Sequence, residues 1–420
     1  MTDLDKARQA INEADREIAR LFEQRMDAVR QVAEYKIKNN LPVEDSSREE
    51  ELFRRNIQHI ENEDNRSYYT SVLKSVVEQS KRLQRDLRKE LFVKTVDGGY
   101  AVHICRGGLH RVGEFLDLDR KVLVVSDSGV PEEYAMTVAS QCTEAVLFVF
   151  QQGESSKCLD TYAAMLQTLV DHQFTRTDCV VAVGGGVVGD IAGFVAATYM
   201  RGIDFYNIPT TVLSQVDSSI GGKTAVDFGG YKNLVGAFYA PKGVLIDSDV
   251  LQTLPLRQIS NGMAEIIKMA MTHDAELIEM LETADQISDD ILYRALAIKK
   301  QVVEADEREA GLRKVLNFGH TFGHAIESVS DYCHGECVAL GMLPMCDETT
   351  RERLVALLEK WGLPITYSGD VKKISEAFRH DKKADGDQID IVYVPQIGTF
   401  EMQKISFAEL NKRLWEMMRG

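Results

Sequence analysis

No glycine occurs before Gly98, and Pro42 is the only proline before Pro131. Residues 3–38 contain neither residue type, so nothing in that stretch interrupts a helix, and its apolar residues recur at helical spacing. We expect one amphipathic helix of about 36 residues there, followed by shorter helices over about 47–60 and 66–89. A helix of that length has too little chain beside it to bury its apolar face, which predicts pairing with a second copy.

The chain also lacks any apolar run approaching the roughly 18–20 residues that span a bilayer. Its charged N-terminus lacks the apolar core of a signal peptide, so we expect a cytoplasmic protein. The net charge of −16 argues against nucleic acid and anionic membranes as partners, but a local basic pocket could still bind small anions. The seven cysteines are odd in number and scattered, which favours small buried side chains over disulfide partners.

Beyond Leu91 the pattern changes, because short β-branched runs such as KVLVV (121–125) and CVVAV (179–183) alternate with helical or turn segments. This alternation predicts a parallel α/β sheet. From about Pro255 the pattern is helical again, and no internal repeat or low-complexity tract is present. The expected fold class is therefore multi-domain, with an all-α three-helix unit over 1–90, an α/β domain over 91–255 and an α-helical domain over 256–420.

Three cations of the first helix, Arg8, Arg25 and Lys36, are 17 and 11 residues apart. Both intervals are close to whole turns of about 3.6 residues, so the three side chains lie along one side of the helix. The alternative is an ordinary solvated surface with about as many acids as bases. The first unit resembles the all-helical chorismate mutases over nearly its whole length, including the link PVEDSSREEEL (42–52). The residues that match the active-site set of that family in order and spacing are Arg8, Arg25, Lys36, Asp45, Arg48, Glu49, Ser80 and Gln84.

The resemblance implies rearrangement of chorismate to prephenate, a unimolecular reaction that needs no nucleophile or proton transfer. Catalysis then consists of holding the reactive conformer and stabilising the charge that builds on the ether oxygen. By the resemblance, Arg8, Arg25 and Arg48 clamp carboxylates, Lys36 and Gln84 contact the ether oxygen, and Glu49 holds a hydroxyl. Arg8 would come from the partner protomer, which agrees with the homodimer expected from the length of the first helix.

The stretch VVAVGGGVVGDIAG (180–193) contains a G-x-G-x-x-G pattern after an expected strand and before an expected helix. Such glycines let backbone N–H groups approach a pyrophosphate, although a tight turn without a ligand has the same pattern. With QGESSK (152–157), the segment 201–241 and MAEIIK (263–268), it resembles 3-dehydroquinate synthase, and this resemblance runs from about 100 to 400. The NAD-binding residues that it implies are Asp127, Glu154, Lys157, Gly185, Gly186, Val187, Gly189, Asp190, Thr210, Thr211, Lys223, Lys232 and Thr253.

The reaction implied is cyclisation of a heptulosonate phosphate to 3-dehydroquinate with loss of phosphate, and it uses NAD and a divalent metal, zinc or cobalt. Related cyclases form valiolone- or inosose-type products, and by the resemblance Lys299, Arg313 and Asn317 favour dehydroquinate. A further lysine, either Lys382 or Lys383, is also expected to reach the site. The implied catalytic residues are Arg201, Asp217, Lys223, Lys232, Asn233, Lys299, Arg313, Asn317, His324, Lys382 and Lys383.

The stretch HTFGHAIESVSDYCHGEC (320–337) holds more candidate metal ligands than one ion can use. His320 and His324 are four residues apart and could share a helix face, while Cys333, His334 and Cys337 form a second candidate cluster. The resemblance assigns Glu265, His320 and His334 as the metal ligands. It leaves His324 as a contact to substrate or phosphate and a possible proton carrier, and it gives the cysteines no role.

The two resemblances together imply a bifunctional shikimate-pathway enzyme, with a chorismate mutase ahead of a 3-dehydroquinate synthase. Its expected ligands are small anions, the heptulosonate phosphate and chorismate. One alternative is a first unit that only dimerises the protein or senses a ligand without turnover. A second alternative is a sugar-phosphate cyclase with a different product.

Overall fold

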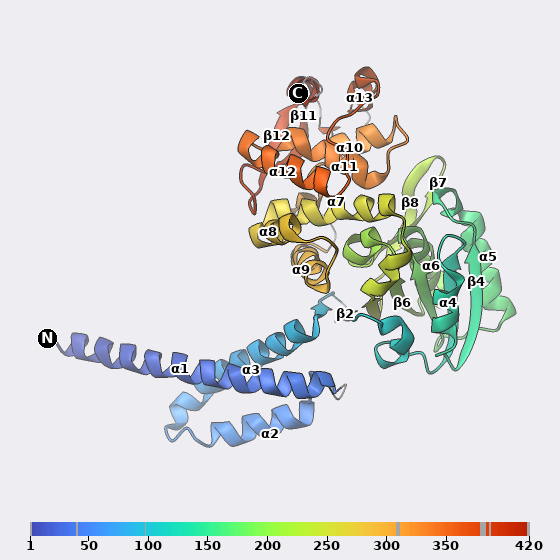
Figure 1. Ribbon diagram of the computed structural model, residues 1–420. Coiled ribbons are helices and arrows are strands. Elements are labelled where there is room, and N and C mark those ends of the chain that lie inside the picture. The colour runs from blue at the N-terminus through green and yellow to red at the C-terminus, as the bar shows by residue number, and fades with distance from the viewer. Residues whose placement is uncertain are drawn as a thin grey trace. The chain divides into compact units, whose positions relative to one another are not determined.

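The computed structural model describes residues 2–38, 41–96, 98–307, 311–378, 384–385 and 388–417. The chain forms two compact units, Met1–Leu91 and Phe92–Gly420. In Figure 1 the first unit is coloured in blue shades, and the second runs from teal through green and yellow to red. The fold class expected from the sequence is confirmed: a helical first unit, then an α/β sheet followed by a mainly helical region. The further division of the second unit at residue 255 stays a prediction.

The first unit consists of three α-helices, α1 (Asp3–Lys38), α2 (Ser46–Ile57) and α3 (Arg66–Arg88), with a short 3-10 turn over Glu63–Asn65. Both α1 and α2 pack against α3. The Asp45 side chain caps α2 by accepting a hydrogen bond of 3.0 Å from the backbone N–H of Arg48, the contact that an N-cap aspartate is suited to make. Helix α1 has the expected bounds, and the other two agree with the sequence to within three residues.

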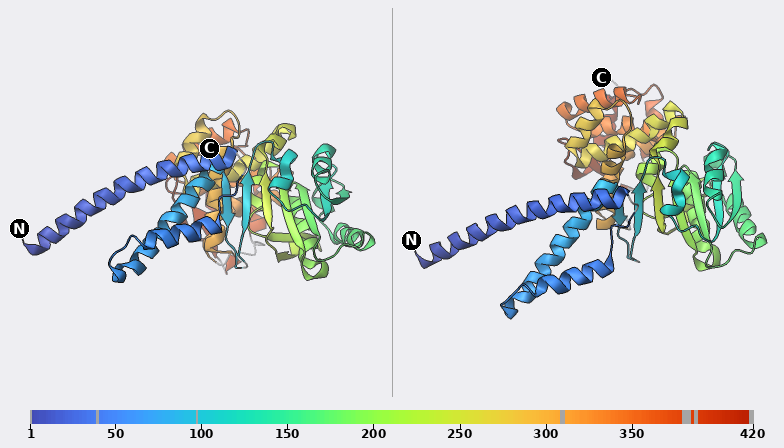
Figure 2. Two further views of the ribbon diagram at one scale, coloured as in Figure 1. Left: turned by 90° about the horizontal axis from the view of Figure 1, so that it is seen from below. Right: turned by 60° about the horizontal axis from the view of Figure 1, so that its bottom comes forward.

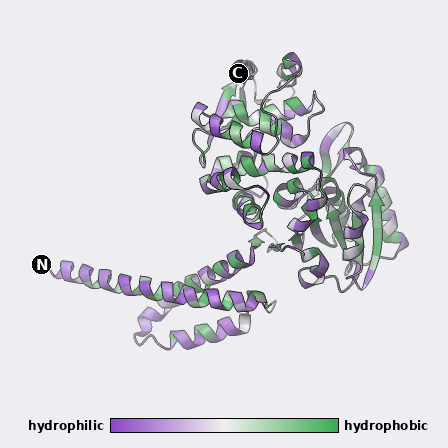
Figure 3. Ribbon diagram, in the orientation of Figure 1, coloured by the Kyte–Doolittle hydropathy of each residue, from purple (hydrophilic) through white to green (hydrophobic). Residues whose placement is uncertain are grey.

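The N-terminal part of α1 runs well beyond α2 and α3 in both views of Figure 2. Apolar residues on this part are exposed, with Ile11 at 59% and Ile18 at 63% exposure. They recur every seven residues from Leu4, and Figure 3 shows apolar turns along an otherwise polar helix. A stripe at this spacing is typical of a helix face that packs against another chain.

The second unit is built on a seven-stranded sheet of order β1-β2-β9-β6-β5-β3-β4. Every strand pair from β2 to β4 in this order is parallel. All six residues of β5 are buried, as expected of a parallel strand covered on both faces. The strands are β1 (Glu90–Val93), β2 (Tyr100–Ile104), β3 (Lys121–Asp127), β4 (Glu144–Phe150), β5 (Cys179–Gly184), β6 (Asp204–Pro209) and β9 (Gly243–Ile246).

Two hydrophobic clusters cover the two faces of this sheet. Helices α5 (Leu159–Asp171) and α6 (Gly186–Thr198) contribute to the first cluster, while α4 (Glu132–Ala139) and a 3-10 segment over Gly108–Glu114 contribute to the second. An antiparallel hairpin of β7 (Lys223–Phe228) and β8 (Tyr231–Phe238) packs on α6. The carboxyl ends of the parallel strands therefore share one edge, where this fold usually binds ligands.

The remainder of the second unit is mostly helical, and it ends in a small antiparallel sheet of order β10-β11-β12 that the sequence reading did not include. Among the described residues, no helix is both long and apolar enough to cross a membrane. The elements are α7 (Leu256–His273), α8 (Ala275–Thr283), α9 (Asp289–Ala305), η7 (Leu312–Asn317), α10 (His320–Glu327), α11 (His334–Met342), α12 (Glu348–Lys360), α13 (Val371–Ala377), β10 (Ala384–Asp385), β11 (Gln388–Tyr393), β12 (Glu401–Ser406) and α14 (Phe407–Met417).

Helix α11 packs closely against both α7 and α10. Glycines make this possible, because a Cβ atom at Gly341 would overlap the carbonyl oxygen of Gly319, and one at Gly335 would overlap that of Asn261. The close packing brings the first turns of α10 and α11 to the middle of α7, where the candidate metal ligands lie.

Candidate functional sites

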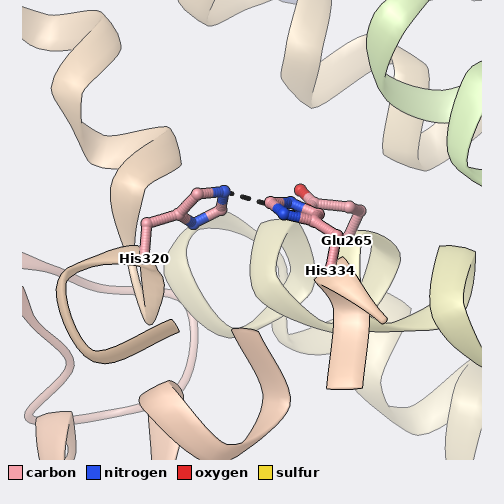
Figure 4. A group of neighbouring side chains, drawn as sticks. All are labelled: Glu265, His320 and His334. Atoms are coloured by element: carbon pink, nitrogen blue, oxygen red, sulfur yellow. Dashed lines mark hydrogen bonds and ion pairs between the residues drawn. The ribbon is translucent and has the colours of Figure 1, made fainter. Parts of the chain in front are cut away.

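Three candidate metal ligands converge between α7, α10 and α11. The ligand atoms of Glu265, His320 and His334 all lie within 4.8 Å of one another, and their side chains point toward a common centre in Figure 4. Glu265 and His320 are both buried. The structure therefore brings together residues that are up to 69 positions apart in the sequence.

The spacing of these atoms fits one tetrahedral ion. Ligands about 2.0–2.2 Å from an ion at tetrahedral angles are roughly 3.3–3.6 Å apart. Glu265 Oε1 lies 3.2 Å from Nε2 of His334 and 3.7 Å from Nε2 of His320. Two imidazole nitrogens and one carboxylate, with further positions left open, form the donor set of a catalytic zinc- or cobalt-type site.

A fourth charged residue, Lys268, forms an ion pair with the other carboxylate oxygen of Glu265. Burial opposes ionisation of Glu265, but Lys268 and His334 hold the pKa of this carboxyl well below its usual range. Burial also lowers the pKa of His334, but its hydrogen bonds to Glu265 and Glu327 outweigh burial and raise that pKa to about 10. Sequence reasoning missed Lys268, although it lies three residues after Glu265 in MAEIIK, which places both on one face of α7.

A cavity of about 650 Å³ adjoins the metal-ligand cluster, and His320 and His334 form part of its wall. Its basic residues, Lys223, Lys268, Lys299 and Arg313, outnumber its two carboxylates, so it suits an anionic substrate. The predicted catalytic residues that line it are Asp217, Lys223, Asn233, Lys299, Arg313, Asn317 and His324.

The remaining predicted catalytic residues are not placed in the lining of this cavity. Arg201 is exposed and ends the short helix over Tyr199–Arg201. The ammonium of Lys232 lies 2.7 Å from Glu327 Oε1, and the Lys232 side chain is largely exposed. Lys382 and Lys383 lie outside the described residues. The assignments of all four stay predictions.

The buried Lys299 and the partly exposed Asp217 form an ion pair of 2.5 Å in the cavity wall. Burial favours the neutral form of each group, so it lowers the pKa of Lys299 and opposes ionisation of Asp217. The attraction of Lys299 outweighs burial at Asp217 and lowers its pKa. The ion pair therefore fixes the Lys299 side chain in the cavity wall, where its nitrogen can donate to an anionic group.

The predicted NAD-binding residues gather at the carboxyl edge of the parallel sheet. Asp127 ends β3, the glycine turn joins β5 to α6, and Thr210 follows β6 directly. A Cβ atom at Gly184 would overlap Val188, so the turn needs glycine there to let the helix approach the strand. A second cavity, of about 600 Å³, opens at the end of β3, and its wall includes Asp127, Pro131 of the following loop, and Leu147 and Val149 of β4.

Lys157 is buried in this region and bonds to Asp190 Oδ2 at 2.5 Å and to Asn233 Oδ1. Burial raises the pKa of Asp190 to about 6, although Lys157 opposes the shift. The predicted residue Thr253 accepts or donates a hydrogen bond with Tyr134 at 2.9 Å. Two members of the predicted NAD set, Lys223 and Lys232, lie on the β7–β8 hairpin. The other members lie at the carboxyl ends of the parallel strands or on the segments that follow these strands, and they include Glu154, Gly185, Gly186, Val187, Gly189 and Thr211.

In the first unit, three of the predicted chorismate-binding residues, Arg25, Ser80 and Gln84, come together where α1 packs against α3. The Arg25 guanidinium donates to Ser80 Oγ, and Gln84 Nε2 donates to the Ser80 carbonyl at 3.3 Å. Gln84 Oε1 is buried and has no hydrogen-bond partner in the described part of the chain. A buried, unpaired amide oxygen is costly, which is consistent with a site that a polar ligand completes.

Other predicted residues of this unit lie at the edge of the same region. Lys36 donates to the carbonyl of Val43 at 2.8 Å, and Glu49 forms an ion pair of 3.1 Å with Lys81. Arg48 pairs with Glu51 at 3.2 Å. Arg8 is exposed and lies about 26 Å along α1 from Arg25, at about 1.5 Å per residue, so one chain cannot bring the two together.

Known proteins resemble both parts of this chain. Residues 7–85 match the family model of chorismate mutase type II. Residues 147–261 and 262–384 match the models of the N-terminal and C-terminal parts of 3-dehydroquinate synthase. A 3-dehydroquinate synthase of Streptococcus suis (strain 05ZYH33) is 40% identical over 348 residues, which cover 76% of this chain and 98% of that protein.

Two solved structures of sugar-phosphate cyclases are similar as well. One is 2-deoxy-scyllo-inosose synthase complexed with carbaglucose-6-phosphate, NAD+ and Co2+, with a TM-score of 0.71, 26% identity and coverage of 78% of this chain and 99% of that one. The other is 2-epi-5-epi-valiolone synthase from Streptomyces hygroscopicus subsp. jinggangensis 5008 with NAD+ and Zn2+ bound, with a TM-score of 0.69, 26% identity and coverage of 76% and 97%. This chain belongs to the 3-dehydroquinate synthase family and carries a chorismate mutase type II domain ahead of the synthase.

Proposed function

We propose that the second unit converts 3-deoxy-D-arabino-heptulosonate 7-phosphate to 3-dehydroquinate and phosphate, and that the first unit rearranges chorismate to prephenate. The observation that carries the first proposal is the cavity in which the two imidazoles of the metal-ligand cluster face Lys223, Lys299 and Arg313. A substrate that bears both a phosphate and a carboxylate matches three cations, and its hydroxyls match an open metal position.

Glu265, His320 and His334 would hold a divalent metal, zinc or cobalt, and the sheet edge around Gly185 and Asp190 would hold NAD. Related cyclases with bound NAD+ and Co2+ or Zn2+ support both assignments. When bound, the metal supplies a Lewis acid that lowers the pKa of a substrate hydroxyl, and NAD supplies reversible hydride acceptance.

The side chains of the chain itself bind and orient the substrate. Lys299 is held in place by its ion pair with Asp217, and Arg313 offers a planar fork for a carboxylate or phosphate. His324 is one turn after His320 on α10, with its ring centroid 5.2 Å from that of His320. We assign it the proton transfer to or from the departing phosphate, because it faces the cavity without serving as a metal ligand.

The product is the finer part of this proposal, because related cyclases form inosose- and valiolone-type products. Dehydroquinate is favoured by the presence of Lys299, Arg313 and Asn317 together in the cavity wall. Incubating the metal- and NAD-loaded protein with the heptulosonate phosphate tests this directly. We expect equal amounts of phosphate and dehydroquinate, and no phosphate release would contradict the assignment in favour of a cyclase with another substrate.

Removing the metal should separate the two activities. Dialysis of the full-length protein against a chelator is expected to abolish phosphate release, because the substrate hydroxyls lose their Lewis acid, while prephenate formation from chorismate continues at its original rate. Zinc or cobalt added back should restore phosphate release. If chelation abolishes prephenate formation as well, the proposal that the first unit needs no metal is wrong. If phosphate release is unchanged after chelation, the proposed metal site of the second unit is wrong.

The first unit is proposed to act as a homodimer in which each site takes Arg8 from the other copy. The 26 Å that separates Arg8 from Arg25 along α1, by about 1.5 Å per residue, supports this arrangement. The exposed apolar stripe of Leu4, Ile11 and Ile18 supplies a surface for the second copy. The alternative, a module that binds chorismate without turnover, would show chorismate binding by calorimetry with no prephenate produced.

A single charge in the apolar stripe tests the dimer. Ile18→Asp is expected to weaken self-association through α1 and to lower prephenate formation at least about tenfold, because an aspartate buried against a second copy must lose its hydration. Sedimentation and a prephenate assay on the same sample measure the two effects. Gln9→Asp adds the same charge at an exposed position on the opposite side of α1 and is the matched control. Equal behaviour of the two variants would contradict a dimer formed through this stripe.

A further inference from the structure

Glu327 is the last residue of α10 and contacts two predicted site residues at once. Its Oε2 lies 3.3 Å from Nδ1 of His334, and its Oε1 accepts from the ammonium of Lys232 at 2.7 Å. On α10 it lies seven residues after His320 and three after His324, so the three side chains share one face of the helix. The side chain is only 22% exposed. No role was assigned to it from the sequence.

The two histidines of the metal-ligand cluster are held in the same way. His320 has its Nδ1 3.2 Å from the carbonyl oxygen of Phe318, and His334 has its Nδ1 beside the Glu327 carboxylate. In both rings the opposite nitrogen, Nε2, faces Glu265. An acceptor at Nδ1 keeps the proton on that nitrogen and leaves the Nε2 lone pair available to an ion.

We propose that Glu327 is a positioning residue of the metal site, which holds the ring of His334 so that Nε2 points at the ion and is itself held by Lys232 of the β7–β8 hairpin. This inference rests on the metal site of the proposed function. The contact between Glu327 and His334 differs from an ordinary surface ion pair, because it orients a predicted metal ligand. The exposed pair with Lys232 alone would add little to stability.

Two substitutions of Glu327 separate positioning from folding. In Glu327→Ala the acceptor is lost, and metal affinity should fall about 10- to 100-fold, the usual effect of removing such a partner. Glu327→Gln keeps an amide oxygen that can accept from Nδ1, and its metal affinity should lie between that of Glu327→Ala and that of the unaltered protein. Affinity is measured by competition with a chromogenic zinc chelator on the full-length protein, without reference to turnover.

Glu282→Ala is the matched control, because Glu282 also lies near the end of a helix and bonds twice to one basic side chain, at 2.8 and 2.9 Å from Arg353. We expect this variant to bind zinc as the unaltered protein does, whatever it does to the melting temperature. Lys232→Met should weaken zinc binding only a few-fold, and it should have no further effect when Glu327 is already alanine, since Lys232 acts through Glu327.

Two outcomes would overturn the inference, and they differ in what else they overturn. If the unaltered protein binds zinc and Glu327→Ala binds it equally well, Glu327 has no positioning role and the metal site stands. If the unaltered protein binds neither zinc nor cobalt, the metal site of the proposed function is wrong and this inference falls with it. The conclusions rest on the zinc affinities and not on the melting temperatures of the metal-free variants.

Discussion

His320→Ala is expected to remove the metal and phosphate release together, whereas His324→Ala is expected to keep the metal and lose only the activity. His320 contributes an Nε2 to the cluster, so its loss leaves two ligands and should weaken metal binding more than about 100-fold, beyond the effect of an outer partner. His324 faces the cavity from the next turn of the helix. Without a proton carrier there, phosphate release should slow by about 10²–10⁴.

Metal content and phosphate release measured on the same preparations distinguish these two histidines. Cys333→Ser is the control, because Cys333 precedes His334 and caps α11, and serine preserves the cap. We expect this variant to retain both metal and activity. If Cys333→Ser loses the metal, or if His324→Ala loses it as fully as His320→Ala, the assignment of Glu265, His320 and His334 is wrong.

Arg25→Ala is expected to lower kcat/KM for chorismate by about two to three orders of magnitude, the usual cost of losing one preorganised charged donor. The guanidinium is partly buried against Ser80, and this burial lowers its pKa. Burial of the charge therefore costs free energy, which a bound anion would offset. Phosphate release from the heptulosonate phosphate should be unchanged, because the substitution lies in the first unit.

The same helix offers a matched control for Arg25. Arg20 pairs with Glu17 on the exposed surface of α1, and Arg20→Ala should leave prephenate formation within about twofold of the original rate, because exposed pairs of this kind contribute little. Prephenate formation that falls equally in both variants would indicate damage to the helix. Unchanged turnover in Arg25→Ala would contradict the chorismate site.

The length of α1 could be predicted from the sequence, since an absence of glycine and proline over a periodic apolar pattern leaves few alternatives to a helix. The metal ligands could not be chosen by local spacing. His320 and His324 have better helical spacing than His320 and His334, and the third predicted ligand, Glu265, lies 55 residues before His320. The resemblance to a known family is what selects this set. In the structure, the close packing of α11 at Gly335 and Gly341 brings the three side chains together.

Lys268 and Glu327 were missed for a related reason. Each is a charged residue on a helix, and such residues are usually solvated. The spacing in MAEIIK places Lys268 on the same helix face as Glu265, but it does not show that this face is buried, and no local spacing indicates that Glu327 faces His334. The β11–β12 pair was missed although the alternation in QIDIVY is a strand signal, because the whole of 256–420 was taken as helical.

The reach of α1 beyond the rest of its unit has a consequence for how the two activities depend on protein concentration. If each mutase site takes Arg8 from a second copy, as proposed, two chains must associate before the first reaction can occur. The cavity of the second unit contains its own cations and metal ligands within one chain. Dilution of the protein would then lower prephenate formation per chain by mass action, to a degree that phosphate release need not follow.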